Sequence, residues 1–313
     1  MRRRSAQAGA PVPFQPAEPS DPDAVLYRRL VAACQRCLDQ LAGEERVALG
    51  DIPAAVEALV DRMAVEGDAL VQRSLRSDEA FSLAAHGAHV AILTVQVGAE
   101  LGLSRTWLVD LAIAALLHDI GMTRVQHLMP VAHHLSAGQI RELREHPLQG
   151  ERLVRNSPGL PPVVREVVVQ EHERADGSGY PHGLGGERIA EPAQLVGLLD
   201  VYEALTHDRP HRVRLVPAQA SRALTEAHRQ AFAKPLLQAF LRAIPLYPVD
   251  SWVQLTTGDL AKVVASHREA PLYPTVAIVA DRQGRAYSQS RTVQLAPSGD
   301  AGIARAISEP ALG

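Results

Sequence analysis

The residues with the clearest chemical potential are His118 and Asp119, adjacent polar side chains that follow the apolar run LAIAALL. A buried charge is costly unless it is paired or coordinated. Histidine is the commonest metal ligand in proteins, and hard cations add carboxylates. The pair therefore predicts either the satisfied polar end of a core helix or part of a metal site, with Gly121 letting the helix end beside that site.

Other helical segments offer ligands of the same kinds at places where a core does not favour them. Glu171 and His172 follow REVVVQ, and Asp200 follows AQLVGLL, both runs of the buried type. One such residue alone is more typical of a satisfied core group, but the whole set favours a metal cluster. The candidate ligands are His86, His118, Asp119, His146, Glu171, His172 and Asp200.

The composition of this ligand set indicates the kind of metal and of chemistry. It contains no thiolate, and mixed imidazole and carboxylate ligands suit iron, manganese or zinc. The set is too large for one tetrahedral ion and fits two divalent ions, which bridging carboxylates hold roughly 3.5–4 Å apart. Asp119 is the expected bridge, and His118 and Asp119 are the expected catalytic pair. Such a site predicts attack of a metal-bound hydroxide on a phosphodiester.

A glycine-dense loop follows the Glu171–His172 pair, in the stretch HERADGSGYPHGLGGERI. Its backbone N–H groups can approach a phosphate or a base closely, and Tyr180 can stack on a nucleobase. The alternative is a flexible surface loop. Arginines suit bidentate contacts to phosphate, although a basic cluster is more often a solvated face. The predicted substrate-binding residues are Gly179, Tyr180, Pro181, Arg209 and Arg212.

The elements that must position these residues are mainly helical. Apolar residues recur at three- and four-residue steps before residue 76, with Asp51 as a helix cap, and helical segments divided by turn residues continue to residue 244. After Pro245, β-leaning runs and hairpin turns predict a small antiparallel sheet and a loose tail. The expected divisions are a disordered lead-in over 1–22, an N-terminal helical region over 23–76, a helical metal-site domain over 77–244, and a β extension with a tail over 245–313.

The bulk composition is that of an ordinary globular protein. The chain has 313 residues, of which 46% are hydrophobic and 21% charged, with a formal net charge of -3. This balance gives no reason to expect a nucleic-acid polymer or a membrane as partner, and no apolar segment is expected to reach bilayer-spanning length. The N-terminus lacks the apolar core of a secretory signal, so a cytoplasmic protein is expected. Cys34 and Cys37 are expected to be reduced and packed on a helix.

Several segments of the chain resemble the motifs of a known family. The segments HGAHVAIL, AALLHDIGM, REHPLQGERLV, QEHERADGSGYPHGLGGERI and LLDVYEALTHDRPHR resemble, in order, the motifs of the HD-GYP family of the HD metal-dependent phosphohydrolase superfamily. They cover about residues 77–244. The stretch YPVDSWVQLTTGDLAKVV also resembles the β extension that follows many HD-GYP domains.

The resemblance implies an all-α bundle with a two- or three-metal site, often of iron or manganese. It implies hydrolysis of cyclic di-GMP to the linear dinucleotide pGpG, to GMP, or to both. By position, it assigns metal binding to His86, His118, Asp119, His146, His172 and Asp200. It assigns substrate contacts to Tyr180 with its glycines, and to Arg209 and Arg212.

Several residues depart from the family pattern. Met122 replaces the lysine of HDIGK, which removes a positive charge near the phosphate region. Glu171 replaces the first of two consecutive histidines, and a carboxylate can still ligate or bridge. Ser82 replaces the glutamate that three-metal members carry four residues before His86, so two metals are expected. Glu203 replaces an aspartate.

Three functions stay open on the sequence. The first is a cyclic di-GMP phosphodiesterase. The second is a degenerate member that senses cyclic di-GMP or docks on diguanylate cyclases (GGDEF proteins) or other signalling proteins. The third is a phosphohydrolase for another nucleotide. The N-terminal helices could form a homodimer or pack on the bundle, and composition does not decide between these.

Overall fold

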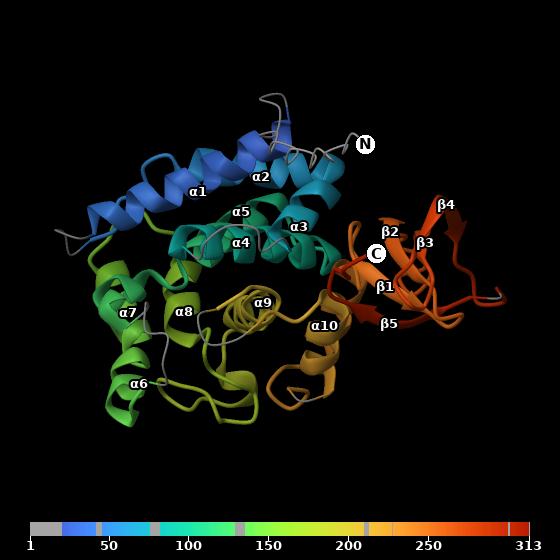
Figure 1. Cartoon of the computed structure of the whole chain (residues 1–313). Coiled ribbons are helices and arrows are strands. Elements are labelled where there is room, and N and C mark those ends of the chain that lie inside the picture. Colours follow the sequence, from blue (N-terminus) through green and yellow to red (C-terminus); the bar gives the residue numbers. More distant parts are fainter. Residues whose placement is uncertain are drawn as a thin grey trace, which may run out of the picture.

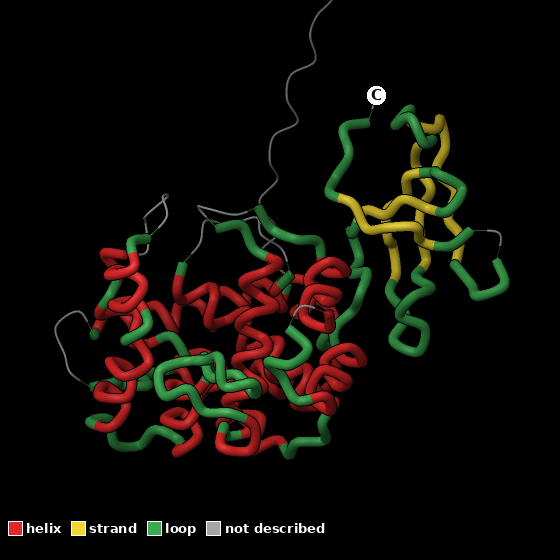
Figure 2. The backbone as a smooth tube through the Cα atoms, turned by 90° about the horizontal axis from the view of Figure 1, so that it is seen from below, coloured by secondary structure: helices red, strands yellow, loops and turns green. Residues whose placement is uncertain are grey.

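The computed structural model describes residues 21–41, 46–75, 82–128, 135–209, 213–226, 228–299 and 301–312. A helical bundle is followed by a β-sheet that lies to one side of it (Figure 1, Figure 2). The predicted mainly α fold with an antiparallel β extension is therefore confirmed. Most of the expected lead-in, and Arg212, lie outside the described residues.

The first three helices are α1 (Pro22–Gln40), α2 (Ile52–Glu66) and α3 (Asp68–Ser74). Asp21 caps α1, because its carboxylate accepts hydrogen bonds from the backbone N–H groups of Asp23 and Ala24. Asp51 stands at the predicted start of α2, but its side chain makes no capping hydrogen bond and pairs with Arg36 instead.

Two almost wholly buried helices form the centre of the bundle, α4 (Leu83–Glu100) and α5 (Arg105–Leu117). They pack against each other, α1 lies against α4, and α2 lies against α5. Both begin at a serine whose hydroxyl accepts a backbone hydrogen bond, Ser82 for α4 and Ser104 for α5. Because the middle of α4 and the C-terminal part of α5 are buried, His86 and His118 are enclosed by protein.

The remaining helical elements surround this pair on the side away from α1 (Figure 1). Helix α9 packs on α4 and α8, and α8 packs on α5 and α7. The bounds are η1 (Ile120–Arg124), η2 (Gln126–Leu128), α6 (Ala137–Leu143), α7 (His146–Arg155), α8 (Pro162–Gln170), η3 (Gly186–Arg188), α9 (Glu191–Thr206), α10 (Pro217–Glu226) and α11 (Lys234–Ala243).

One continuous hydrophobic core joins the N-terminal helices to the rest of the bundle. It runs from Tyr27 and Leu30 on α1 through the centre of α4 and α5 to Phe240 on α11. Cys34 and Cys37 belong to this core as free, buried thiols, as expected. Side chains of α1 therefore pack in the same core as α4 and α5, so changes in α1 can affect residues there.

The sheet has a separate, smaller core. It also contains a strand within the stretch that was expected to be a loose tail. Its strands are β1 (Trp252–Leu255), β2 (Leu260–Ala265), β3 (Thr275–Ala280), β4 (Ala286–Gln294) and β5 (Ile303–Ile307), in the order β4-β3-β2-β1-β5. The expectation of a loose tail is wrong at β5, which pairs antiparallel with β1. Pairing with a strand about fifty residues earlier in the chain supplies the partner that local sequence does not show.

One segment, Arg105–Arg124, is apolar and long enough by composition alone to cross a membrane. The expectation that no segment reaches this length is therefore wrong. The segment has a mean hydropathy of 1.3, but 61% of its apolar window is buried inside the protein. A buried core helix meets the same criterion, and this one contributes α5 to the centre of the bundle.

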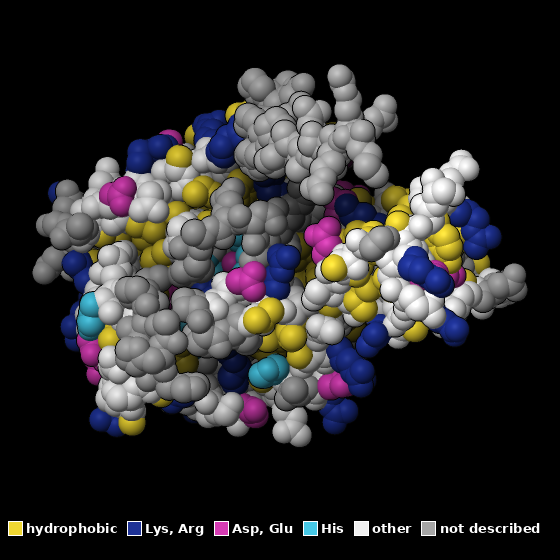
Figure 3. Space-filling view, viewed as in Figure 1, with side chains coloured by type: hydrophobic (Ala, Val, Ile, Leu, Met, Phe, Trp, Pro, Cys, Tyr) yellow, Lys and Arg dark blue, Asp and Glu magenta, His cyan; other side chains and the backbone are white. Residues whose placement is uncertain are grey.

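The surface carries charges of both signs. On the face shown in Figure 3, basic and acidic side chains are scattered over the bundle and the sheet. This distribution agrees with the small formal net charge of -3.

Candidate metal centre

The predicted ligands come from five places in the bundle and meet at one point. His86 lies on α4, His118 and Asp119 end α5, and His146 is the first residue of α7. Glu171 and His172 follow α8, and Asp200 lies on α9. The packing of α4, α5, α8 and α9 thus brings together ligands that are far apart in sequence.

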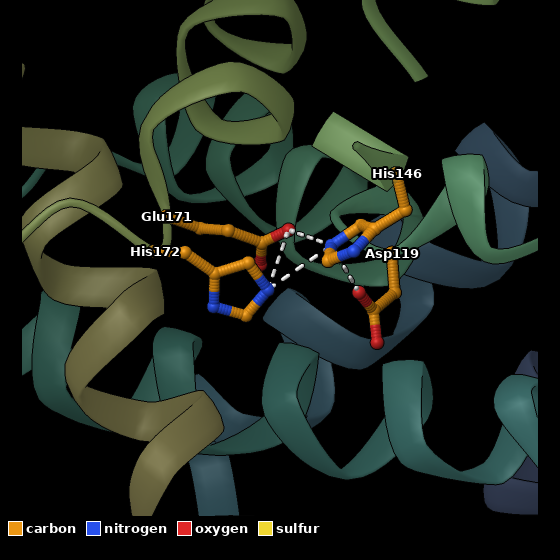
Figure 4. A group of neighbouring side chains, drawn as sticks. All are labelled: Asp119, His146, Glu171 and His172. Atoms are coloured by element: carbon orange, nitrogen blue, oxygen red, sulfur yellow. Dashed lines mark hydrogen bonds and ion pairs between the residues drawn. The ribbon is translucent and has the colours of Figure 1, made fainter. Parts of the chain in front are cut away.

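The ligands form two groups that share Asp119. One group is His86, His118 and Asp119, and the other is Asp119, His146, Glu171 and His172. In the second group, the four side chains point toward a common centre (Figure 4). Such an arrangement matches a site for more than one ion.

Two carboxylates reach across the site with different oxygens. Asp119 places Oδ1 3.2 Å from Nε2 of His146 and Oδ2 3.6 Å from Nε2 of His86. Asp200 places Oδ1 3.3 Å from Nε2 of His86 and Oδ2 3.9 Å from Nδ1 of His172. Each carboxylate therefore lies near histidines on both sides of the site, and a bridging role for Asp119 stays a prediction.

Hydrogen bonds on the outer sides of the imidazoles fix their orientation. Nδ1 of His118 donates to the carbonyl oxygen of Ala115 at 2.7 Å, and Nδ1 of His146 donates to that of Leu143 at 2.7 Å. A backbone carbonyl only accepts, so these contacts place the proton on Nδ1 and leave the Nε2 lone pair for the centre. This is the usual arrangement around metal-binding histidines.

The carboxylate of Glu171 is the best test of whether the residues fit a metal. Glu171 is fully buried, and neither of its oxygens has a hydrogen-bond partner among the described residues. Its oxygens lie 3.5 Å from Nε2 of His118 and 3.9 Å from Nε2 of His146. A buried carboxylate is costly without a hydrogen-bond partner, and ring nitrogens with lone pairs lie within 3.9 Å of it. A divalent cation satisfies both, so the donor set fits a metal.

The pKa values of the site shift in opposite directions. Burial acts to lower the pKa of His86, but the charge of Glu203 opposes it and helps to raise the pKa to about 10. Burial raises the pKa of Glu171 to about 7. Burial and the charge of His146 lower the pKa of His172 to about 3. Neighbouring ligands thus compete for protons, whereas a bound cation favours the deprotonated form of all of them.

Two glycines allow the ligand-bearing elements to approach closely. A Cβ at Gly121 would lie 1.9 Å from the carbonyl oxygen of His146, and one at Gly197 would lie 2.1 Å from that of Glu171. Gly121 is not in the left-handed region, so its role is close contact between η1 and α7 rather than the helix-ending conformation expected from sequence.

The glycine-dense loop that contains Gly179, Tyr180 and Pro181 lies against His172. Tyr180 stacks on His172 with ring centroids 4.6 Å apart, and the guanidinium of Arg144 lies 5.3 Å from the centre of the Tyr180 ring. A Cβ at Gly179 would lie 2.4 Å from Cα of Glu173, so the turn beside Tyr180 requires glycine. Pro181 follows Tyr180 in the same turn. The loop is therefore a fixed wall of the site.

Glu173 fixes this loop and was not predicted. It is buried, and its carboxylate accepts hydrogen bonds from the backbone N–H groups of His182 at 2.7 Å and Leu184 at 2.8 Å. The N–H of Tyr180 donates to the carbonyl of His172. These amides are occupied within the protein, so at these positions the expected exposed N–H groups for a phosphate are not found. The only sequence signal for Glu173 was its position between His172 and the glycines.

The predicted arginines fall in different situations. The guanidinium of Arg209 donates to Oε2 of Glu203 at 2.9 Å, behind His86, and Arg212 lies outside the described residues. Phosphate binding by either arginine stays a prediction. Met122 lies in η1, three residues after Asp119, and is partly buried.

A third buried group, His89, Glu203 and His207, was not predicted as such. Glu203 contacts Nδ1 of His86 at 2.7 Å and Nδ1 of His89 at 3.2 Å. His89 in turn lies 2.8 Å from the hydroxyl of Tyr27. The spacing of His86 and His89 on one helix was the only available signal, because Tyr27 and Glu203 are distant in sequence.

Comparison with known proteins identifies the class to which this fold and site belong. A family model for the HD domain matches residues 70–234, more than half of the chain, and a model described as a KOW domain associated with HD domain matches residues 252–312. The chain belongs to the HD domain family. It is related to HD-GYP cyclic di-GMP phosphodiesterases at 25–30% identity.

Particular relatives place the chain more closely. It is 30% identical over 215 residues to a cyclic di-GMP phosphodiesterase of Pseudomonas aeruginosa, covering 68% of this chain and 52% of the relative. It is 28% identical to 3'3'-cGAMP-specific phosphodiesterase 3 of Vibrio cholerae, covering 55% of this chain and 37% of the relative. The chain thus spans about half the length of the first relative and 37% of the length of the second.

A solved structure supports the fold. A protein of Bdellovibrio bacteriovorus described as an HDG"Y"P protein superposes with a TM-score of 0.59 at 18% identity, covering 71% of this chain and 73% of that chain. With the buried His, Asp and Glu groups, the family match defines an HD-domain protein with a site consistent with several metal ions.

Proposed function

We propose that the protein hydrolyses cyclic di-GMP at a two-metal site, giving linear pGpG, GMP or both. The observation that carries the proposal is the fully buried Glu171 carboxylate, which lacks a hydrogen-bond partner and lies among ring nitrogens aimed at the same centre. The relatives named as cyclic di-GMP phosphodiesterases support the choice of substrate.

The seven predicted ligands hold the ions in this proposal. Two divalent ions, iron or manganese with zinc as the alternative, would polarise the phosphodiester and supply a nucleophile at neutral pH. Asp119 and Asp200 connect the two halves of the site through separate oxygens. His118 and His146 present Nε2 because their Nδ1 protons are held by carbonyls.

A cavity of about 790 Å³ beside the metal centre gives room for the rest of the substrate. His172 and Tyr180 lie on its wall, and Arg144 and Arg229 add positive charge that suits a dianionic dinucleotide. Gly179 and Pro181 shape the wall around Tyr180, and Arg209 and Arg212 are proposed phosphate contacts. A base that stacks on Tyr180 would have to share the ring with Arg144 and His172.

A second candidate substrate is another cyclic dinucleotide. One relative carries the name 3'3'-cGAMP-specific phosphodiesterase, and Met122 changes the charge next to the site. A third candidate is a non-enzymatic sensor or docking partner of diguanylate cyclases, which Met122 and Glu171 favour because they depart from the family pattern.

The test is to purify the protein anaerobically, measure bound metal and supply cyclic di-GMP and 3'3'-cGAMP in parallel. About two metal ions per chain, with cleavage of cyclic di-GMP that is lost in Asp119→Ala, is the expected result. Cleavage of 3'3'-cGAMP alone would favour the second candidate. Metal-free protein that binds cyclic di-GMP without cleaving it would favour the sensor.

A further inference from the structure

We propose that Tyr27, on the N-terminal helix α1, is a positioning residue for the metal centre and acts on His86 through His89 and Glu203. The inference rests on the metal site of the proposed function. The HD domain match begins at residue 70, so Tyr27 lies outside it. A residue from the N-terminal region would thereby tune a ligand of the HD site.

The contacts form an unbroken series from α1 to the metal centre. The Tyr27 hydroxyl lies 2.8 Å from Nε2 of His89, whose Nδ1 lies 3.2 Å from Oε1 of Glu203. The other oxygen, Oε2 of Glu203, lies 2.7 Å from Nδ1 of His86. Nε2 of His86 faces the centre, 3.3 Å from Asp200.

The chemistry of the groups sets the direction of each hydrogen bond. An ionised Glu203 only accepts, so Nδ1–H of His86 and Nδ1–H of His89 both donate to it. Nε2 of a neutral His89 then accepts from the Tyr27 hydroxyl, and Nε2 of a neutral His86 offers its lone pair to a metal. Each member thus fixes the orientation of the next.

Burial makes these contacts difficult to replace. Tyr27 is 4% exposed, His89 7%, Glu203 1% and His86 2%. Water has little access to substitute for a lost partner at these exposures. Partners of metal-binding histidines typically change metal affinity 10–100-fold when they are removed.

Helix α3 also contacts Tyr27. The guanidinium of Arg73, on α3, lies over the Tyr27 ring at 5.6 Å and contacts the carboxylate of Asp21 at 3.3 Å. Asp21 is the residue that caps α1. The N-terminal helices therefore present Tyr27 to His89 as part of a packed unit.

The alternative for this group is a separate metal site formed by His89, Glu203 and His207. The Nδ1 atoms of both histidines and the oxygens of Glu203 are already engaged, since Nδ1 of His207 donates to the backbone carbonyl of Glu203 at 3.0 Å and Arg209 pairs with the carboxylate. The His89 and His207 rings stack with an interplanar angle of 24°. A hydrogen-bonded support for His86 explains these contacts better than an ion does.

The experiment compares Tyr27→Phe with Tyr202→Phe in the full chain. Tyr202 is equally buried and lies on the helix that carries Glu203, but its hydroxyl takes no part in the series of contacts. The probe is Mn²⁺ alone, titrated into metal-free protein against a competing chelator, with circular dichroism to verify folding. A second readout is kcat and KM for hydrolysis.

The expected result is an affinity about tenfold lower for one of the two Mn²⁺ ions in Tyr27→Phe, with wild-type affinities in Tyr202→Phe. In a His89→Ala background, Tyr27→Phe should add no further loss, because the series is already broken. With the loaded enzyme, kcat should fall more than KM rises.

Four outcomes would overturn the proposal. Wild-type Mn²⁺ affinities in Tyr27→Phe would exclude the positioning role while leaving the proposed function intact. Additive losses in the double variant would show that Tyr27 and His89 act separately. A third Mn²⁺ ion in the wild type that His207→Ala removes would establish the separate metal site instead. Absence of any Mn²⁺ binding by the wild type would overturn the proposed function as well.

Discussion

Two buried groups of histidines and a glutamate lie in the bundle, and they differ in how the glutamate is satisfied. Glu171 has no hydrogen-bond partner among the described residues, whereas Glu203 contacts His86, His89 and Arg209. Both side chains are almost completely buried. The same residue types therefore occur in two situations: the Glu171 site would be completed by an ion, whereas the contacts of Glu203 are supplied within the protein.

The difference teaches how a metal site can be distinguished from a polar core network. Spacing and composition alone group His89, Glu203 and His207 with the metal clusters. The positions of the hydrogen-bond partners separate them, because a buried carboxylate without a partner is costly unless a cation is present.

The largest effect is expected from a matched pair of histidine variants. His118→Ala removes a ring whose Nε2 faces the metal centre, and we expect metal affinity to fall at least about a hundredfold and turnover to be lost. His207→Ala removes a ring from the satisfied group and should retain both metal ions. Metal analysis and hydrolysis assays measure the two results. Equal metal loss in both variants would contradict the distinction.

The next prediction compares Glu171→Gln with Glu203→Gln in metal-free protein. Glu171→Gln removes a buried charge that has no hydrogen-bond partner among the described residues, so we expect the free energy of unfolding to rise by about 1–3 kcal/mol. Glu203→Gln breaks a buried pair with Arg209 and leaves that charge behind, so stability should fall by about 3 kcal/mol or more. Chemical denaturation measures both values.

Addition of Mn²⁺ completes this comparison. The metal should stabilise the wild type and Glu203→Gln, but it should give little stabilisation to Glu171→Gln because a ligand is missing. A decrease in metal-free stability for both variants would show that Glu171 is satisfied by contacts within the protein.

A smaller effect, a gain in activity, is expected when a positive charge is added beside the group of Asp119, His146, Glu171 and His172. Met122→Lys places a cation in η1 close to Asp119, where the family resemblance expects a lysine. A charge-assisted contact contributes about 1.5–3 kcal/mol, so kcat/KM for cyclic di-GMP should rise about tenfold. Met122→Leu is the control and should match the wild type. If Met122→Lys changes neither turnover nor affinity, this position does not limit the enzyme.

The part of this site that sequence could predict is the set of ligands. Three of the candidate sites were recognisable because a polar residue followed an apolar helical run, as Asp200 does after AQLVGLL. This pattern lies within a short stretch of sequence, so it can be recognised without knowledge of the packing. The mainly α fold followed from helical periodicity for the same reason.

The residues that were missed depend on contacts between distant parts of the chain. Tyr27 and His89 are 62 residues apart, and His89 and Glu203 are 114 apart. Strand β5 was missed because its partner, β1, lies about fifty residues earlier. The helix-ending role expected for Gly121 was wrong, because the close approach of the His146 backbone follows only from the fold.

The smallest effect is expected at a third kind of carboxylate, one that is paired at the surface. Glu100, the last residue of α4, accepts a hydrogen bond from Arg242 of α11 at 2.7 Å and pairs with Arg268, which lies between β2 and β3. It thus connects the bundle to the sheet. The hydrogen bonds from Arg242 and Arg268 lower the pKa of Glu100 below its ordinary value of 4.5.

Because the pKa is lowered in the folded state, the contribution of Glu100 to stability is present above about pH 4.5 and is lost as the pH falls below it. Glu100→Gln should therefore reduce the free energy of unfolding at pH 7 by less than about 1 kcal/mol, and the difference from the wild type should disappear near pH 3. Glu166→Gln, at an exposed glutamate, is the control and should change little at either pH. A difference at pH 7 as large as that of Glu203→Gln would mean that exposure does not separate weak carboxylate pairs from strong ones in this protein.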